Sequence, residues 1–315
     1  MKKALLSLGL LLMSFALAQY PDQPITYVVP WSPGGGTDTT SRTVATFLQE
    51  ELGQPVNVVN RTGGGGVVGH LATASADADG YTIGAVTVEI TMMHWTGLTD
   101  LTFESYTPLA LLVNNNAAVT VRADAPWDTL DELVAYIREN PGELQASGTS
   151  LGGIWDLARI GFLDSAGLPA DAMPWVPSQG AAPAFQELLA GGVDVVTAAL
   201  AEANTLRQAG EVKVLGVMAD ERLESFPDVP TLAEQGYDWS IGGWVSLAAP
   251  AGVSDEVVDT LAAAIDATMT NPEFLERMGT AGLNIQYVPT SDIAAFMTEQ
   301  NETMGALLEA AGVIQ

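Results

Sequence analysis

The stretch Ile25-Thr26-Tyr27-Val28-Val29-Pro30-Trp31-Ser32-Pro33-Gly34-Gly35-Gly36-Thr37-Asp38 decides the fold class. Its first five residues are β-branched or aromatic, which is typical of a strand. A turn with three consecutive glycines follows, and residues 39–52 are expected to form a helix. The same order returns with a strand at 55–59, a glycine-rich turn at 60–66 and a helix to residue 76. This repetition predicts a parallel sheet with helices packed on it.

The rest of the chain continues this alternation, with no linker, tandem repeat or low-complexity tract. We therefore expect two α/β lobes, each a mainly parallel sheet flanked by helices. Residues 19–121 plus 242–315 would form the first lobe, and residues 122–241 the second. The further strands are expected at 81–86, 117–121, 144–147, 173–176, 193–200, 212–219 and 244–248, and the further helices at 129–140, 155–166, 182–189, 254–270 and from 291 onward.

The first 18 residues have the pattern of a cleavable secretory signal peptide. Lys2 and Lys3 precede an apolar run from 4 to 17, and Ala16-Leu17-Ala18 gives a small-residue cleavage site. The run is short for a bilayer span. A buried N-terminal helix is the structural alternative, but the charged and cleavage flanks favour export. The mature chain is expected in the periplasm or another extracytoplasmic space.

Composition excludes several classes of partner and site. The 315 residues carry 38 acidic and 11 basic side chains, for a formal net charge of -27. This balance argues against binding to nucleic acid and to anionic lipid surfaces. There are no cysteines, so disulfides and thiolate metal sites are impossible. Neither a metal nor a cofactor is expected.

The glycine-rich loop at 33–38 has two interpretations. Glycine lets the backbone approach a ligand closely, and amide groups at the start of a helix favour an anion. The loop would also serve as a plain tight turn with Asp38 in the first helical turn. A P-loop is excluded, because no Gly-Lys-Ser/Thr follows. For the second loop, Gly63-Gly64-Gly65-Gly66, close packing is a better interpretation than ligand contact.

A third loop, Gly148-Thr149-Ser150-Leu151-Gly152, matches the Gly-x-Ser-x-Gly pattern of hydrolase nucleophiles. That pattern requires a histidine after the serine, but His70 and His94 both precede Ser150. As a binding loop, the same residues offer hydroxyls and amides to a carboxylate. We therefore expect binding here and not catalysis, and both histidines are expected to be packing or surface residues.

Acidic and aromatic side chains lie near the same expected strand ends. Asp38, Glu89, Asp156 and Glu202 are each ordinary loop charges when taken singly, but as a group they would receive a cationic group of a ligand. Aromatic walls are common in small-molecule sites, although aromatics fill cores equally often. The tryptophans near these loops are Trp31, Trp95, Trp155 and Trp244.

Several segments together resemble the solute receptors of tripartite tricarboxylate transporters, the Bug family. They cover nearly the whole mature chain in the expected order. The segments are Tyr20-Pro21-Asp22-Gln23-Pro24-Ile25-Thr26, Val29 through Asp38, Asn60-Arg61-Thr62 with the glycines that follow, Asp79-Gly80-Tyr81-Thr82, Asn140-Pro141-Gly142, Leu188 through Asp194, Phe226 through Gly236, and Ala249-Pro250-Ala251-Gly252-Val253.

The resemblance implies a two-lobe, flytrap-like periplasmic binding protein without catalysis. It implies a ligand carboxylate held between the loops at 32–38 and 148–150, and a membrane permease as partner. A monomer is expected. Together, the residues and the resemblance give these candidate ligand-binding residues: Trp31, Ser32, Gly35, Gly36, Thr37, Asp38, Glu89, Gly148, Thr149, Ser150, Gly180 and Glu202.

The chain departs from the family pattern around the expected pocket. The tyrosine that is usual on the second lobe is missing from Val176-Pro177-Ser178-Gln179-Gly180. A histidine common after the third loop is replaced in Ile154-Trp155-Asp156. The segment after Asp194, which often ends in an acid or amide, reads Ala198-Ala199-Leu200-Ala201-Glu202 here. The ligand class therefore stays open between a di- or tricarboxylate, an amino acid and an aromatic acid. Two alternative functions remain, a receptor for a membrane signalling partner and an exported serine hydrolase.

Overall fold

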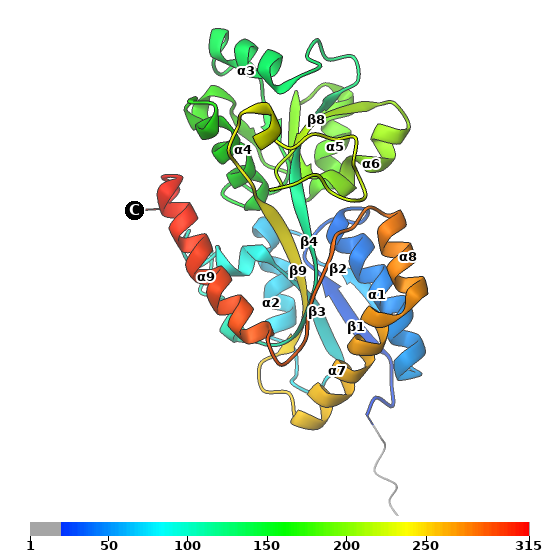
Figure 1. Cartoon of the computed structure of the whole chain (residues 1–315). Coiled ribbons are helices and arrows are strands. Elements are labelled where there is room, and N and C mark those ends of the chain that lie inside the picture. The colour runs from blue at the N-terminus through cyan, green and yellow to red at the C-terminus, as the bar shows by residue number, and fades with distance from the viewer. Residues whose placement is uncertain (1–19, 315) are drawn as a thin grey trace, which may run out of the picture.

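The computed structural model describes residues 20–314, which form two α/β lobes joined by two long strands (Figure 1). The strands of both lobes belong to one hydrogen-bonded sheet in the order β2-β1-β3-β9-β4-β7-β5-β6, with β8 and β10 also paired to β4. The signal peptide predicted at 1–18 lies outside the described residues. Within 20–314, no helix is long and apolar enough to cross a membrane.

The first lobe is built on three parallel strands, β2 (Val56–Asn60), β1 (Ile25–Val29) and β3 (Thr82–Thr87). Successive side chains of a strand point to opposite faces. Ile83 and Ala85 therefore pack with α1 (Gly36–Leu52), α7 (Asp255–Thr270) and α8 (Pro272–Thr280). Gly84 faces α2 (Val67–Ala74) on the other side of the sheet.

The second lobe repeats this arrangement with the parallel strands β6 (Trp175–Val176), β5 (Ala146–Ser147) and β7 (Val195–Ala199). Its core includes Phe162 and Leu133, both fully buried. The parallel pairing expected from the sequence thus holds among the outer strands of each lobe. The remaining elements of this lobe are α3 (Leu130–Glu139), α4 (Ile154–Ser165), α5 (Ala181–Ala190), α6 (Leu200–Gln208) and β8 (Val212–Val217).

Two strands cross between the lobes and add antiparallel pairs. Strand β4 (Tyr106–Arg122) pairs with β9 (Gly242–Pro250) as far as Asn116, with β7 from Ala117 onward and with β8 from Ala118 onward. The chain therefore changes partners between Asn116 and Ala117. The sequence placed the lobe boundary after 121, and that division remains a prediction. The strand predicted at 117–121 is the last part of the longer strand β4. The earlier part was not predicted, because Pro108 and Asn114-Asn115-Asn116 interrupt the apolar pattern of the strand.

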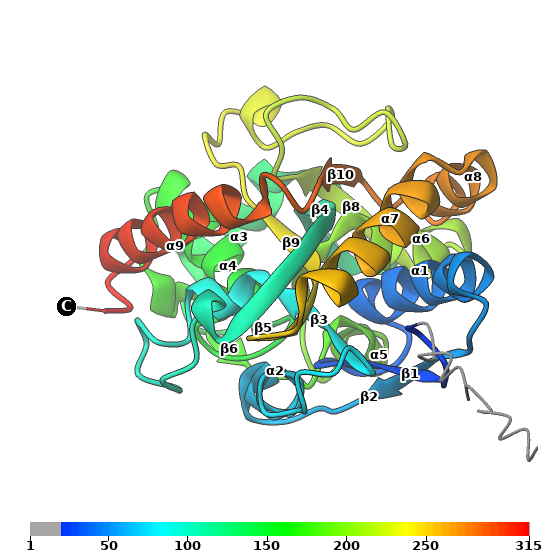
Figure 2. The same ribbon diagram turned by 90° about the horizontal axis from the view of Figure 1, so that it is seen from below.

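The C-terminal helix α9 (Ile293–Ala310) runs along one side of the molecule (Figure 2). It packs on the first lobe through the 3-10 turn η2 (Val88–Thr91) and β4. Its far end, at Leu307 and Ala311, lies beside α4 of the second lobe. Strand β10 (Ile285–Val288), which precedes α9, pairs with β4. The sequence pattern predicted α9, whereas α6, α8 and β10 were not predicted.

Candidate functional site

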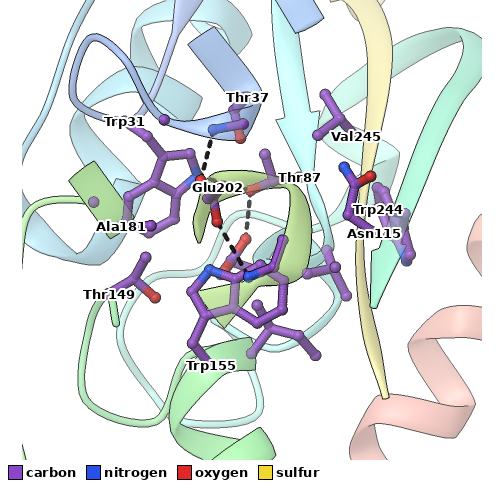
Figure 3. A pocket seen from close by; sticks show the side chains of 18 of the residues that line it. Trp31, Thr37, Thr87, Asn115, Thr149, Trp155, Ala181, Glu202, Trp244 and Val245 are labelled. Atoms are coloured by element: carbon purple, nitrogen blue, oxygen red, sulfur yellow. Dashed lines mark hydrogen bonds between the residues drawn. The ribbon is translucent and has the colours of Figure 1, made fainter. Parts of the chain in front are cut away.

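A narrow cavity lies between the lobes, where β1, β3 and β7 end and α1, α4 and α5 begin (Figure 3). Its volume is about 40 Å³, far below the roughly 300 Å³ of a typical drug-sized ligand site. The lobes are therefore closed on a small space. The predicted site residues that line it are Trp31, Ser32, Gly35, Gly36, Thr37, Glu89, Thr149, Gly180 and Glu202.

The first loop is held in shape by Asp38, which is buried behind the cavity and does not line it. Its carboxylate accepts hydrogen bonds from the Gly34 amide (3.0 Å), Arg42 Nε (2.9 Å) and Asn60 Nδ2 (2.8 Å). Gly34 has a φ of 84°, which favours glycine. Burial alone would raise the pKa of Asp38, but hydrogen bonds from Arg42, Gly34 and Asn60 hold it below its ordinary value of 3.8.

We expect Asp38→Asn to destabilise the protein by about 1–3 kcal/mol at pH 7, because a buried charged acceptor becomes a neutral amide. A lowered pKa stabilises the fold above the ordinary value of 3.8, and this stabilisation is lost as pH falls through the folded pKa. Urea unfolding should therefore show a smaller difference from wild type at about pH 3 than at pH 7. Asp220→Asn, which removes an exposed charge, is the control. An equal effect of both variants would contradict the role of Asp38.

The third loop has the same construction as the first. Both read Ser-x-Gly-Gly-x-x-Asp, at 32–38 and at 150–156. The Asp156 carboxylate accepts from the Gly152 amide (2.9 Å), as Asp38 does from Gly34. Gly152 has a φ of 70°, close to that of Gly34. As a result, α1 and α4 present their first turns to one cavity from opposite lobes.

Each of these helix N-termini faces a glutamate from the opposite lobe. The Gly36 amide at the start of α1 donates to Glu202 Oε1 (2.6 Å), and the Ala199 amide donates to Oε2 (3.3 Å). The carboxylate of Glu89 accepts from Thr87 Oγ1, and the nearby Ile154 amide at the start of α4 lowers its pKa. The sequence selected both glutamates but gave no sign of this reciprocal arrangement.

The enclosed position of these acids changes how they ionise. Burial raises the pKa of Glu202 to about 7, against the opposing effect of the Gly36 and Ala199 amides, and the charge of Glu89 raises it further. Burial also raises the pKa of Glu89, opposed by hydrogen bonds from Thr87 and Ile154. Neighbouring carboxylates disfavour each other's charged form. The cavity therefore favours any group that would neutralise this negative charge.

Three tryptophans are among the residues that line the cavity, and Trp31 and Trp155 lie next to Glu202 (Figure 3). Trp31, Trp155 and Trp244 are all buried. Trp31 Nε1 donates to Thr87 Oγ1 (3.3 Å), and Trp244 Nε1 donates to Gln300 Oε1 (3.1 Å), which fixes both rings. Trp95 lies outside the lining residues, and its Nε1 donates to the Asn301 carbonyl (3.3 Å).

Two further predicted residues lie behind or beside the cavity. Gly148 is required by packing, since a Cβ there would lie 2.8 Å from the side chains of Trp155 and Trp175. Ser150 lies beside Gly65, whose ideal Cβ would be 3.1 Å from that of Ser150. The second glycine-rich loop thus packs against the other lobe, as the sequence favoured.

His70 has no contact that would suit it to catalysis with Ser150. Its Nδ1 lies 2.8 Å from the Gly66 carbonyl, and its Nε2 accepts from the Thr87 amide (3.2 Å). Burial lowers the pKa of His70 to about 4, opposed by the Gly66 hydrogen bond. The ring is therefore neutral at pH 7 and serves packing between α2 and the end of β3.

Several lining residues were not selected from the sequence. Trp155 and Trp244 were predicted only as aromatic residues near the loops. For Asn115, the one available signal was that a run of three asparagines interrupts an apolar strand. The others lie at element ends whose position depends on the tertiary fold. The full set is Thr87, Val88, Asn115, Ile154, Trp155, Ala181, Ala199, Gly243, Trp244 and Val245.

Known proteins share this two-lobe arrangement. The family model TctC, described as the tripartite tricarboxylate transporter family receptor, matches residues 40–313. The chain belongs to this receptor family. A UPF0065 protein of Bordetella pertussis is 31% identical to it over 297 residues, covering 93% of this chain and 91% of the relative.

Solved receptors of this kind superpose well on the chain. The periplasmic binding protein BugD has a TM-score of 0.87 at 28% identity, covering 94% of this chain and 99% of BugD. A protein of R. palustris solved with adipate has a TM-score of 0.88 at 25% identity, with coverage of 94% and 99%. The predicted family and periplasmic-binding-protein fold are confirmed. The tricarboxylate transporter receptor is accordingly a solute-binding protein and not an enzyme.

Proposed function

We propose that this receptor captures a small organic acid between its lobes and delivers it to the membrane permease of a tripartite transporter. The observation that carries the proposal is the cavity itself, which is lined by loops from both lobes and crossed by the two connecting strands. A ligand there contacts both lobes at once. The relative solved with adipate supports a carboxylate as ligand.

The mechanism we infer is a shift between open and closed forms. A ligand that contacts both lobes binds the closed form more tightly than the open form, and so increases its population. Thr37 and Ser32 of the first loop and Thr149 of the third supply hydroxyl groups at the cavity. Export through the signal peptide at 1–18, action as a monomer and release to the permease subunits complete the proposal.

We expect at least one small organic acid to raise the melting temperature of the purified mature protein. At about 100 times its Kd, a ligand stabilises by about 2.7 kcal/mol, which corresponds to a shift of roughly 5 °C for a chain of this size. The panel should contain di- and tricarboxylates, amino acids and aromatic acids, with calorimetry to confirm each hit. If no acid in this panel binds, the receptor is not one for small organic acids.

A further inference from the structure

Glu89 and Glu202 face one cavity from opposite lobes without a cationic partner there. No lysine, arginine or histidine is among the described residues that line the cavity. Glu89 is only 4% exposed, and the group that donates to its carboxylate is the neutral Thr87 hydroxyl. Glu202 accepts from two amides. Buried charges in proteins are normally paired, so this pair lacks a positive group.

The two carboxylates also occupy the places that would hold an anionic ligand. A helix N-terminus favours an anion because its first amides are unpaired. Glu202 already lies against the first turn of α1, since a Cβ at Gly36 would be 3.3 Å from its Cδ. Glu89 lies close enough to the Ile154 amide at the start of α4 for that amide to lower its pKa. A dicarboxylate spanning the cavity would bring both its charged ends close to like charges.

We propose that Glu89 and Glu202 form a subsite for a cationic amine, so that the preferred ligand is an organic acid that also carries a positively charged nitrogen. The proposal rests on the proposed function as an organic-acid receptor and narrows its ligand class. A protonated amine between the two carboxylates donates to both of them. Because one glutamate comes from each lobe, this contact forms only when the lobes are closed.

The walls of the cavity fit the same ligand. Trp31 and Trp155 lie next to Glu202 in the cavity (Figure 3), and an ammonium group over an indole face is attracted by the ring. An aromatic lining with adjacent acidic groups therefore holds a cation in two ways.

Thr149 supplies the group for the other end of the ligand. Its side chain lines the cavity and is only 4% exposed, yet its Oγ1 has no hydrogen-bond partner among the described residues. A buried hydroxyl without a partner is costly. As a donor to the ligand's carboxylate, Thr149 would be satisfied. The cavity thus has an acceptor pair for an amine and an unused donor for an acid.

Two series of matched compounds test this proposal by calorimetry at about pH 8, above the pKa of Glu202 of about 7. One is succinate, γ-aminobutyrate and putrescine, and the other is adipate, ε-aminocaproate and hexamethylenediamine. Within each series the length is similar and a carboxylate is exchanged for an amine. In at least one series we expect the amino acid to bind tighter than the dicarboxylate by about tenfold or more, the value of one charge-assisted hydrogen bond.

Variants then assign the preference to the two glutamates. Glu202→Gln and Glu89→Gln keep the shape but remove the charge, and each should weaken amino-acid binding by about tenfold while leaving dicarboxylate binding equal or tighter. Glu139→Gln, an exposed charge on α3, is the control and should change neither. Thermal unfolding establishes that each variant is folded. If a variant does not fold, the preference of the wild-type protein between the matched amino acid and dicarboxylate still tests the amine subsite.

The outcomes separate this inference from the proposed function. A dicarboxylate that binds wild type as tightly as the matched amino acid, or tighter, in both series overturns the amine subsite and leaves the organic-acid receptor intact. Binding by the diamines without binding by any acid supports the subsite and overturns the organic-acid receptor. Failure of all six compounds overturns the subsite, and the wider panel of acids then decides the proposed function.

Discussion

Asp156→Ala is expected to cost about 3–5 kcal/mol of folding free energy, because it leaves a buried arginine without its partner. Arg159 Nη2 lies 2.6 Å from Asp156 Oδ1, and the two side chains are 6% and 3% exposed. The same guanidinium donates to the carbonyls of Met173 and Ala170, which ties α4 to the segment before β6. Neither carbonyl replaces the lost negative charge.

The same substitution should also weaken ligand binding. Asp156 Oδ2 accepts from the Gly152 amide and so fixes the loop that carries Thr149. Urea unfolding and calorimetry with the tightest acid found would measure the two effects. Asp228→Ala is the control, because its pair with Arg207 has a carboxylate that is 70% exposed and should contribute less than about 1 kcal/mol.

A double variant distinguishes an unpaired charge from a general loss of packing. Asp156→Ala combined with Arg159→Met removes both charges, and it should recover part of the stability lost in the single variant. If the double variant is no more stable than Asp156→Ala, and Asp156→Ala itself costs no more stability than Asp228→Ala, then the buried pair contributes no more than a surface pair.

Gly69→Ala is expected to destabilise the protein by about 1–3 kcal/mol or more, and to disturb the first loop of the site. An added Cβ would lie 2.4 Å from Pro30 Cα and 2.7 Å from the Arg61 carbonyl oxygen. These are backbone atoms, which cannot move aside as a side chain does. Helix α2 would have to shift away from β1, and Trp31, which follows Pro30 in the chain, would lose its position in the cavity wall.

The matched control is Gly279→Ala in α8, which has nothing within 4 Å of the added Cβ. Alanine is the better helix former, so this variant should be stabilised by up to about 1 kcal/mol. The melting temperature and the near-ultraviolet spectrum of the tryptophans report the two changes. A Gly69→Ala protein as stable as wild type, with an unchanged spectrum, would contradict the close contact with Pro30.

Local sequence signals were sufficient for the frame of the first lobe. The strand at 25–29, the glycine turn and the helix after it follow from residues that are neighbours in the chain. The repeated Ser-x-Gly-Gly-x-x-Asp pattern at 32–38 and 150–156 was also readable, and it would have placed Asp156 beside Asp38 as a loop-holding residue. Asn271 and Pro272 are a cap and first-turn pair that would have revealed α8.

Other features depend on contacts far apart in the sequence. Strand β4 continues through polar residues because the crossing strand β9 hydrogen-bonds to it there. Helix α6 follows β7 without an intervening turn residue, so no boundary signal was present. Gly36 and Glu202 are 166 positions apart, and only the closed lobes bring them together. The glutamates were found as charges near strand ends, but their reciprocal binding was not.

The matched loops have a consequence for how the molecule opens. Each lobe contributes one helix N-terminus and one glutamate, so separating the lobes breaks the Gly36–Glu202 hydrogen bond and moves Glu89 away from Ile154 in the same movement. The hydrogen bond from the Ser32 hydroxyl to the Gln179 carbonyl (3.0 Å) is broken in the same movement. A partly open form would lose these bonds before water could fully solvate the freed groups. Opening is therefore expected to be cooperative, with few intermediates between the shut and the solvated cleft.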